Sequence, residues 1–204
     1  PHADNAHAGA WAASDESARS GWQEISYRGV AASSPVGPDN QWRELVIGML
    51  DRGEILIDDI QVTEDPDGRN GRLLSNSSFQ ASIFGGTALR SWRFRGNHRH
   101  SELVPDPEDP NNNVLRLVAT GATGHMHNHM ETTFAGGARV TNGETYEISF
   151  RARYVSGSPQ LLTRLYFNRL PKAHILQTPS ESGTPCAPNS RLETNIGPTF
   201  TDLN

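Results

Sequence analysis

The stretch Thr145–Tyr154, TYEISFRARY, decides the fold class, because apolar and polar side chains alternate along it without a break. On a β-strand, successive side chains point to opposite faces. One face therefore holds Tyr146, Ile148, Phe150, Ala152 and Tyr154, and the other holds Glu147, Ser149, Arg151 and Arg153. The pattern predicts a half-buried strand of an antiparallel sheet, with its apolar face in the core.

Runs with similar alternation recur on both sides of this strand, and clusters of Gly, Pro, Asn and Asp separate them. Helical periodicity is scarce. Many short strands joined by turn-rich segments predict an all-β fold, a sandwich or a barrel of antiparallel strands. The other expected strands are Gly21–Val30, Gln41–Met49, Glu54–Val62, Val114–Ala119, His125–Phe134 and Gln160–Leu170.

The segment 65–72 combines Pro, Asp-Gly and Asn-Gly turn signals, which makes it the expected linker. Residues 1–64 supply too few strands to cover both faces of a sandwich. We therefore expect 1–64 to be the C-terminal part of one module, with its front half upstream or its missing strands supplied by a neighbouring chain. Residues 73–176 are expected to form a second, nearly complete module. Residues 177–204, rich in Pro, Ser and Thr, indicate an extended tail or linker.

Composition and motifs exclude several classes of function. The net charge of −5 argues against a general nucleic-acid binder, which needs a basic surface. No apolar run approaches the roughly 18 residues of a membrane span. The single cysteine, Cys186, excludes an intrachain disulfide and a cysteine-based metal cluster. No nucleophile elbow, phosphate loop or dinucleotide fingerprint is present, so we expect no catalytic activity.

Three pieces of the chain together resemble the galactose-binding-like, jelly-roll carbohydrate-binding modules of the cellulose- and xylan-binding type. Leu73–Gln80, followed by Trp92, is similar to their opening strand. Val140–Arg153 is close to an internal strand of these modules. Glu54–Val62 resembles their closing strand and stands just before the next opening strand, as in a tandem pair.

This resemblance implies an antiparallel jelly-roll β-sandwich that binds a polysaccharide or another glycan without catalysis. Gly183–Ser190 is similar to a sequence motif of large secreted bacterial proteins, which often carry lamin-tail-like and spore-coat-kinase-like domains. We therefore expect a secreted or cell-surface location. Neighbouring copies or flanking domains are further expected partners. Two alternatives stay open: a structural or assembly module completed by strand addition, and a metal-dependent enzyme fragment that uses the histidine cluster.

The polar faces of the expected strands supply the candidate glycan-binding residues. Arginine offers planar donors to hydroxyls and carboxylates, and a tyrosine ring can stack on a pyranose. An ordinary solvated sheet face is the alternative, since polar residues point outward on most antiparallel sheets. The candidates of this kind are Arg116, Arg151, Arg153, Arg164 and Tyr166.

A cluster of histidines is the most unusual local feature. On a strand, His125, His127 and His129 would project to one side about 6.8 Å apart. That spacing is too wide for all three to bind one ion at about 2 Å each. Two of them could bind a metal together with His98 or His100. Hydrogen bonding to a glycan and plain strand packing are the alternatives.

Asp58 and Asp59 are candidates for a structural calcium site. Neighbouring strand residues face opposite sides, so one of the two carboxylates is expected to face inward. An inward carboxylate needs a partner, either a cation or backbone donors. In the resembling modules a glutamate in the opening strand also helps to hold calcium, and here Gln80 replaces it. The acid-rich run 102–110 is expected to be a solvated loop.

Overall fold

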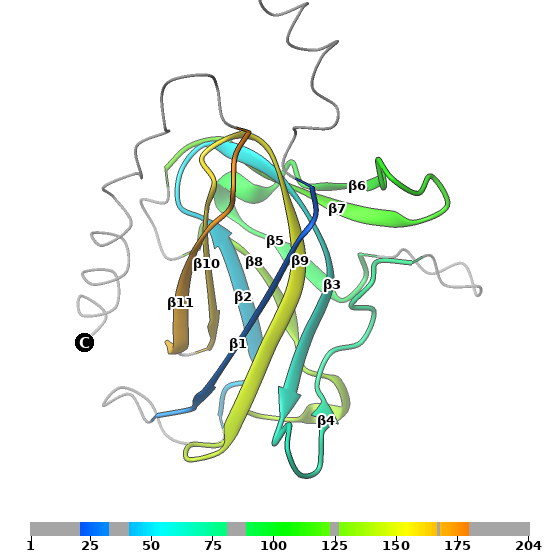
Figure 1. Cartoon of the computed structure of the whole chain (residues 1–204). Coiled ribbons are helices and arrows are strands. Elements are labelled where there is room, and N and C mark those ends of the chain that lie inside the picture. The colour runs from blue at the N-terminus through cyan, green and yellow to red at the C-terminus, as the bar shows by residue number, and fades with distance from the viewer. Residues whose placement is uncertain (1–20, 33–40, 81–88, 123–126, 167, 180–204) are drawn as a thin grey trace, which may run out of the picture.

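The computed structural model describes residues 21–32, 41–80, 89–122, 127–166 and 168–179. These residues form two antiparallel sheets that pack face to face as a β-sandwich (Figure 1). The expected all-β sandwich is therefore confirmed. Besides strands, the described residues contain two short 3-10 turns, η1 (Gly96–His98) and η2 (Ala135–Gly137). Within this part of the chain, no helix has the length and apolar character that a bilayer crossing requires.

The first sheet, sheet A, has the strand order β1–β9–β3–β7–β6, and the short β4 pairs with one end of β3. Every pairing in it is antiparallel. Its strands are β1 (Gln23–Val30), β3 (Gly53–Glu64), β4 (Gly71–Arg72), β6 (Glu102–Pro105), β7 (Asn113–Ala119) and β9 (Thr145–Gly157).

The second sheet, sheet B, has the strand order β11–β10–β2–β8–β5. Its pairings are antiparallel as well. Its strands are β2 (Glu44–Met49), β5 (Trp92–Phe94), β8 (Met130–Thr133), β10 (Gln160–Leu165) and β11 (Arg169–Ile175).

The alternation of β9 has the predicted consequence for the core. Tyr146, Ile148 and Phe150 are at most 1% exposed, while Arg151 and Arg153 lie on the opposite face. Ile47 of β2 and Leu161 of β10 belong to the same core cluster from sheet B. Burying each such side chain contributes about 1.5–3 kcal/mol, so the apolar stripe of β9 stabilises the contact between the sheets.

The expected division into two modules is wrong. β3, assigned to a first module, lies between β9 and β7, and β2 lies between β10 and β8. The segment 65–72 does not connect two bodies, because it turns back so that Arg72 in β4 pairs with Thr63 in β3. The strands that the first part lacks therefore come from the later part of the same chain.

Two expected strands are shorter than the alternation indicated. Gln160–Leu170 is a hairpin rather than one strand, because the chain turns back after Leu165 and Arg169 pairs with it. Asn168, in this turn, has the positive φ of 56° that asparagine tolerates better than most residues. His125–Phe134 contributes only β8, Met130–Thr133.

His98 of η1 is a buried structural group. Its Nε2 accepts a hydrogen bond from the backbone N–H of Met49 at 2.9 Å. The ring proton is therefore on Nδ1, which lies 2.5 Å from Asn97 Oδ1 and donates to it. Burial, together with the nearby His129, lowers the pKa of His98 to about 3. The ring is neutral in the folded chain at physiological pH.

We expect the free energy of unfolding to fall as the pH drops below 6.5. Unfolded histidines take up protons near pH 6.5, whereas burial lowers the folded pKa of His98 to about 3 and that of His174 to about 4. The contribution of the two histidines to the free energy of unfolding is therefore fully present above pH 6.5 and is lost on acidification. For His98 the loss is about 1.4 kcal/mol per pH unit. Urea unfolding at pH 7 and pH 5 should differ by about 2 kcal/mol from His98 alone. In a His98→Gln variant, the difference in the free energy of unfolding between pH 7 and pH 5 should be smaller. If the variant shows the same difference as the unchanged protein, this account is contradicted.

Candidate functional site

The outer face of sheet B carries a row of side chains that crosses four strands. The register pairs Arg164 of β10 with Val46 of β2, Val46 with Glu131 of β8, and Glu131 with Arg93 of β5. Their sequence neighbours Leu45, Met130 and Leu165 lie in the core, so the row points away from the sandwich interior. We call this row, with the flanking His129 and Tyr166, the sheet B face.

Glu131 forms ion pairs with several charged side chains of this face. Arg93 Nε lies 2.8 Å from its Oε1, and Arg95 contacts the same oxygen at 2.9 Å. His129 Nε2 lies 3.1 Å from Oε2. The hydrogen bond with His129, and those from the two arginines, hold the pKa of Glu131 far below its usual range. Glu131 is therefore a fixed anion that orients two half-exposed guanidinium groups.

Arg164 is a buried member of the sheet B face. It is only 5% exposed, and Val46 and Leu162 beside it are 2% and 9% exposed. Burial lowers the pKa of Arg164 to about 10, which still leaves it charged at neutral pH. Side chains on the solvent side of a sheet are seldom this buried, so the face differs from an ordinary solvated one.

Aromatic side chains lie at one end of the row. The rings of Trp42 and Tyr166 meet edge to face, with their centroids 4.8 Å apart. The backbone N–H of Tyr166 donates to the Glu44 carbonyl at 2.9 Å, which places the tyrosine beside the start of β2. Burial raises the pKa of Tyr166, so its hydroxyl keeps its proton and can donate. The face thus combines rings, guanidinium groups and a carboxylate.

The other arginine candidates lie on sheet A, on the opposite side of the sandwich. Arg116 forms ion pairs with Glu54 at 2.7 Å and with Glu102 at 2.9 Å. Arg153 pairs with Glu108 at 2.9 Å. The structure therefore brings His129, Arg164 and Tyr166 together, and separates them from Arg116, Arg151 and Arg153.

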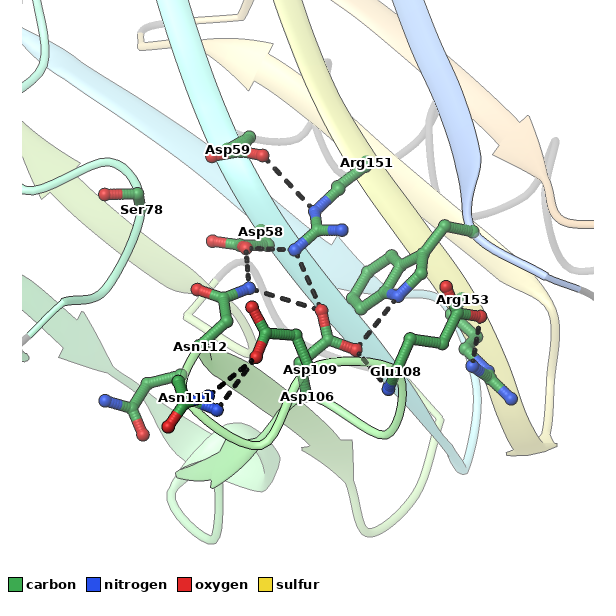
Figure 2. Close-up of polar contacts among 12 residues, drawn as sticks. Asp58, Asp59, Ser78, Asp106, Glu108, Asp109, Asn111, Asn112, Arg151 and Arg153 are labelled. Atoms are coloured by element: carbon green, nitrogen blue, oxygen red, sulfur yellow. Dashed lines mark hydrogen bonds and ion pairs between the residues drawn. The ribbon is translucent and has the colours of Figure 1, made fainter.

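Arg151 is surrounded by three carboxylates (Figure 2). Its guanidinium group lies 2.7 Å from Asp58, 3.0 Å from Asp106 and 3.3 Å from Asp59, and 4.2 Å from the ring centre of Trp22. Burial opposes its charge, but the hydrogen bond with Asp58 and the three negative charges raise the pKa of Arg151. Asp58 is buried and its neighbour Asp59 is exposed. Neither carboxylate faces inward as expected, because Asp58 pairs with Arg151 on the polar face of sheet A and a register shift after Asp58 interrupts the alternation.

The histidines do not converge. His98 is a core residue, and His100 is exposed. The rings of His127 and His129 lie 6.4 Å apart, and His127 precedes the strand on which alternation was expected to place it. His125 lies outside the described residues. In the described part of the chain, no three His, Cys, Asp or Glu side chains are arranged to hold a metal ion.

A comparison with known protein families indicates the kind of ligand that this part of the chain binds. Residues 71–169 match the carbohydrate binding domain family. No curated protein and no solved structure matches the chain. The match covers just under half of the chain and supports a non-catalytic, carbohydrate-binding role.

The carbohydrate binding domain match and the sandwich do not have the same boundaries. The matched residues include β8 and β10, which carry Glu131 and Arg164, but β1, β2 and β3 precede them. Val46, in the middle of the row, thus comes from outside the match. The sheet B face is complete only when the unmatched strand β2 lies between β10 and β8.

Several residues of the sheet B face and of the carboxylate cluster around Arg151 were not among the sequence-based candidates. Arg93 and Arg95 alternate with Trp92 and Phe94, but this signal is too short to separate a strand from a loop. The run 102–110 was expected to be a solvated loop, yet it begins with β6, and Asp106 is only 3% exposed. No local pattern indicates that Arg151, 45 positions away, neutralises Asp106.

Proposed function

We propose that this chain is a non-catalytic module of a secreted or cell-surface protein, and that it binds an acidic polysaccharide on the sheet B face. The observation that carries the proposal is the row Arg164–Val46–Glu131–Arg93, flanked by aromatic rings at one end. The carbohydrate binding domain match supports a glycan as the ligand.

The charges of the face favour a ligand with carboxylate groups. Arg93, Arg95 and Arg164 supply three positive charges, against the carboxylates of Glu131 and Glu44. With more positive than negative charges, this face is a local positive region on a chain whose net charge is −5. Arginine binds planar carboxylates through paired hydrogen bonds, and Tyr166 and Trp42 offer aromatic surface to a sugar ring.

Affinity electrophoresis tests both parts of this proposal. Gels would contain polygalacturonate, its fully methyl-esterified form, or neutral glucomannan, with EDTA and about 0.15 M salt, so that exposed charge effects are screened. We expect polygalacturonate to retard the chain at least about tenfold more strongly than the ester, because one lost charged contact costs about 1.4 kcal/mol or more. Equal retardation by the ester would overturn the preference for acids, and no retardation by any glycan would overturn the function.

A further inference from the structure

The side-chain amide nitrogen of Gln80 points toward three oxygen atoms that accept hydrogen bonds. Its Nε2 lies 2.7 Å from the Ser78 carbonyl and 3.2 Å from the Asn113 carbonyl. The same nitrogen makes a short hydrogen bond to Asn112 Oδ1. An amide nitrogen has only two hydrogens, so three acceptors gather around a group that can satisfy two of them.

Asn112 links this oxygen group to the carboxylates around Arg151. Its Nδ2 donates to Asp58 Oδ2 at 3.1 Å and to Asp106 Oδ2 at 3.2 Å. Figure 2 shows Asn112 between the two carboxylates, with Ser78 on the far side of Asp58 from Arg151. Asp58 is 1% exposed, and its Oδ1 has no hydrogen-bond partner within the described residues. A buried, unpartnered carboxylate oxygen requires an explanation.

Carboxylate, amide and backbone carbonyl oxygens are the ligands that calcium takes in proteins. The residues present nevertheless do not fit a calcium ion, because nitrogen groups lie where the oxygens meet. The Gln80 amide faces the neutral oxygens, and the Arg151 guanidinium faces Asp58 and Asp106. A metal at either position would meet N–H groups that cannot coordinate it.

We propose that the Gln80 amide and the Arg151 guanidinium take the place of a metal cation, and that the single change Gln80→Glu turns this position into a calcium site. Glutamate has almost the shape of glutamine but only accepts hydrogen bonds. It would add a carboxylate to the oxygens of Ser78, Asn112 and Asn113, close to Asp58. One arginine cannot neutralise that additional charge, so the variant needs a cation.

Thermal unfolding in calcium and in EDTA tests this inference on the full chain. The unchanged protein should have the same midpoint in both, within about 1 °C. Gln80→Glu should unfold earlier in EDTA and gain about 5 °C or more in calcium, as expected for an ion present at about 100 times its dissociation constant. Gln80→Met, which removes the donor without adding charge, should not respond to calcium. Gln61→Glu, the same chemical change at a position on β3, is the matched control and should not respond either.

A direct count of bound ions keeps the test decisive if Gln80→Glu is unstable without metal. The variant is then expressed and purified in calcium, and its calcium content is measured after gel filtration. We expect one ion per chain in the variant and none in the unchanged protein. Calcium bound to the unchanged protein would show that the amide does not replace a cation. A variant that binds no calcium, or that does not fold even in calcium, would equally overturn the inference. None of these outcomes bears on glycan binding by the sheet B face.

Discussion

Replacing Arg93 and Arg95 together by methionine should weaken the binding of polygalacturonate at least about 30-fold, the loss of about 2 kcal/mol typical of a strong contact. Both guanidinium groups are half exposed and are held in place by Glu131, so they can meet a ligand without reorganising. Methionine keeps much of the aliphatic side chain and removes the charge. Isothermal titration with a short galacturonate oligomer measures the change.

The matched control for this prediction replaces Arg116 and Arg153 by methionine. These arginines lie on the outer face of sheet A, and the change in net charge is the same. If the ligand contacts the sheet B face, the control should keep its affinity within about threefold, since distant exposed charges are screened at physiological salt. Equal losses in the two double variants would mean that overall charge, and not this face, determines binding.

Replacing Arg151 by methionine should lower the free energy of unfolding by about 3–5 kcal/mol, because it leaves a buried carboxylate without its partner. Asp58 is 1% exposed and Asp106 is 3% exposed, and both pair with the Arg151 guanidinium. Urea unfolding at pH 7 measures the loss. It should shrink in the combined Arg151→Met and Asp58→Asn variant, in which the uncompensated charge is removed as well.

Arg153 offers an internal comparison on the same strand and the same face. It pairs with Glu108, whose side chain is 59% exposed, so Arg153→Met should cost less than about 1 kcal/mol. The two arginines look equivalent in the sequence, since both belong to the polar set of β9. Similar losses for the two variants would contradict the structural role assigned to the cluster around Arg151.

The alternation of side chains predicted the elements but not their partners. The apolar stripe Tyr146–Phe150 and the core position of Leu161 follow from the two-residue period, which is a local property of the chain. Pairing is not local, because β9 contacts β1 and β3, more than 80 positions earlier in the sequence. The sequence pattern therefore predicts strands far better than it predicts which strands are neighbours.

The error about two modules has a specific physical origin. Glu54–Val62 resembles a closing strand and Leu73–Gln80 resembles an opening strand, so their order along the chain indicates the end of one module and the start of another. In the structure, β3 lies in the middle of sheet A, and Ser77 O accepts a hydrogen bond from Ile60 N. Both segments thus belong to one sandwich.

The candidate site was only partly predictable for a similar reason. Alternation assigns Arg116, Arg151 and Arg164 alike to polar strand faces, but it cannot state which sheet each strand joins. The structure places Arg164 across Val46 from Glu131 and within electrostatic reach of Tyr166, and it places Arg151 against Asp58. One arginine therefore lies in the proposed glycan-binding face, and another neutralises a buried aspartate.

The most direct test of the central proposal is to map the bound glycan on the folded chain by amide chemical shifts during titration with a galacturonate oligomer. We expect the largest shifts on the strands of the sheet B face, in Glu44–Gly48, His129–Thr133 and Leu162–Tyr166. Shifts concentrated on β9, β3 and β7 of sheet A, with the sheet B face unchanged, would contradict the proposal.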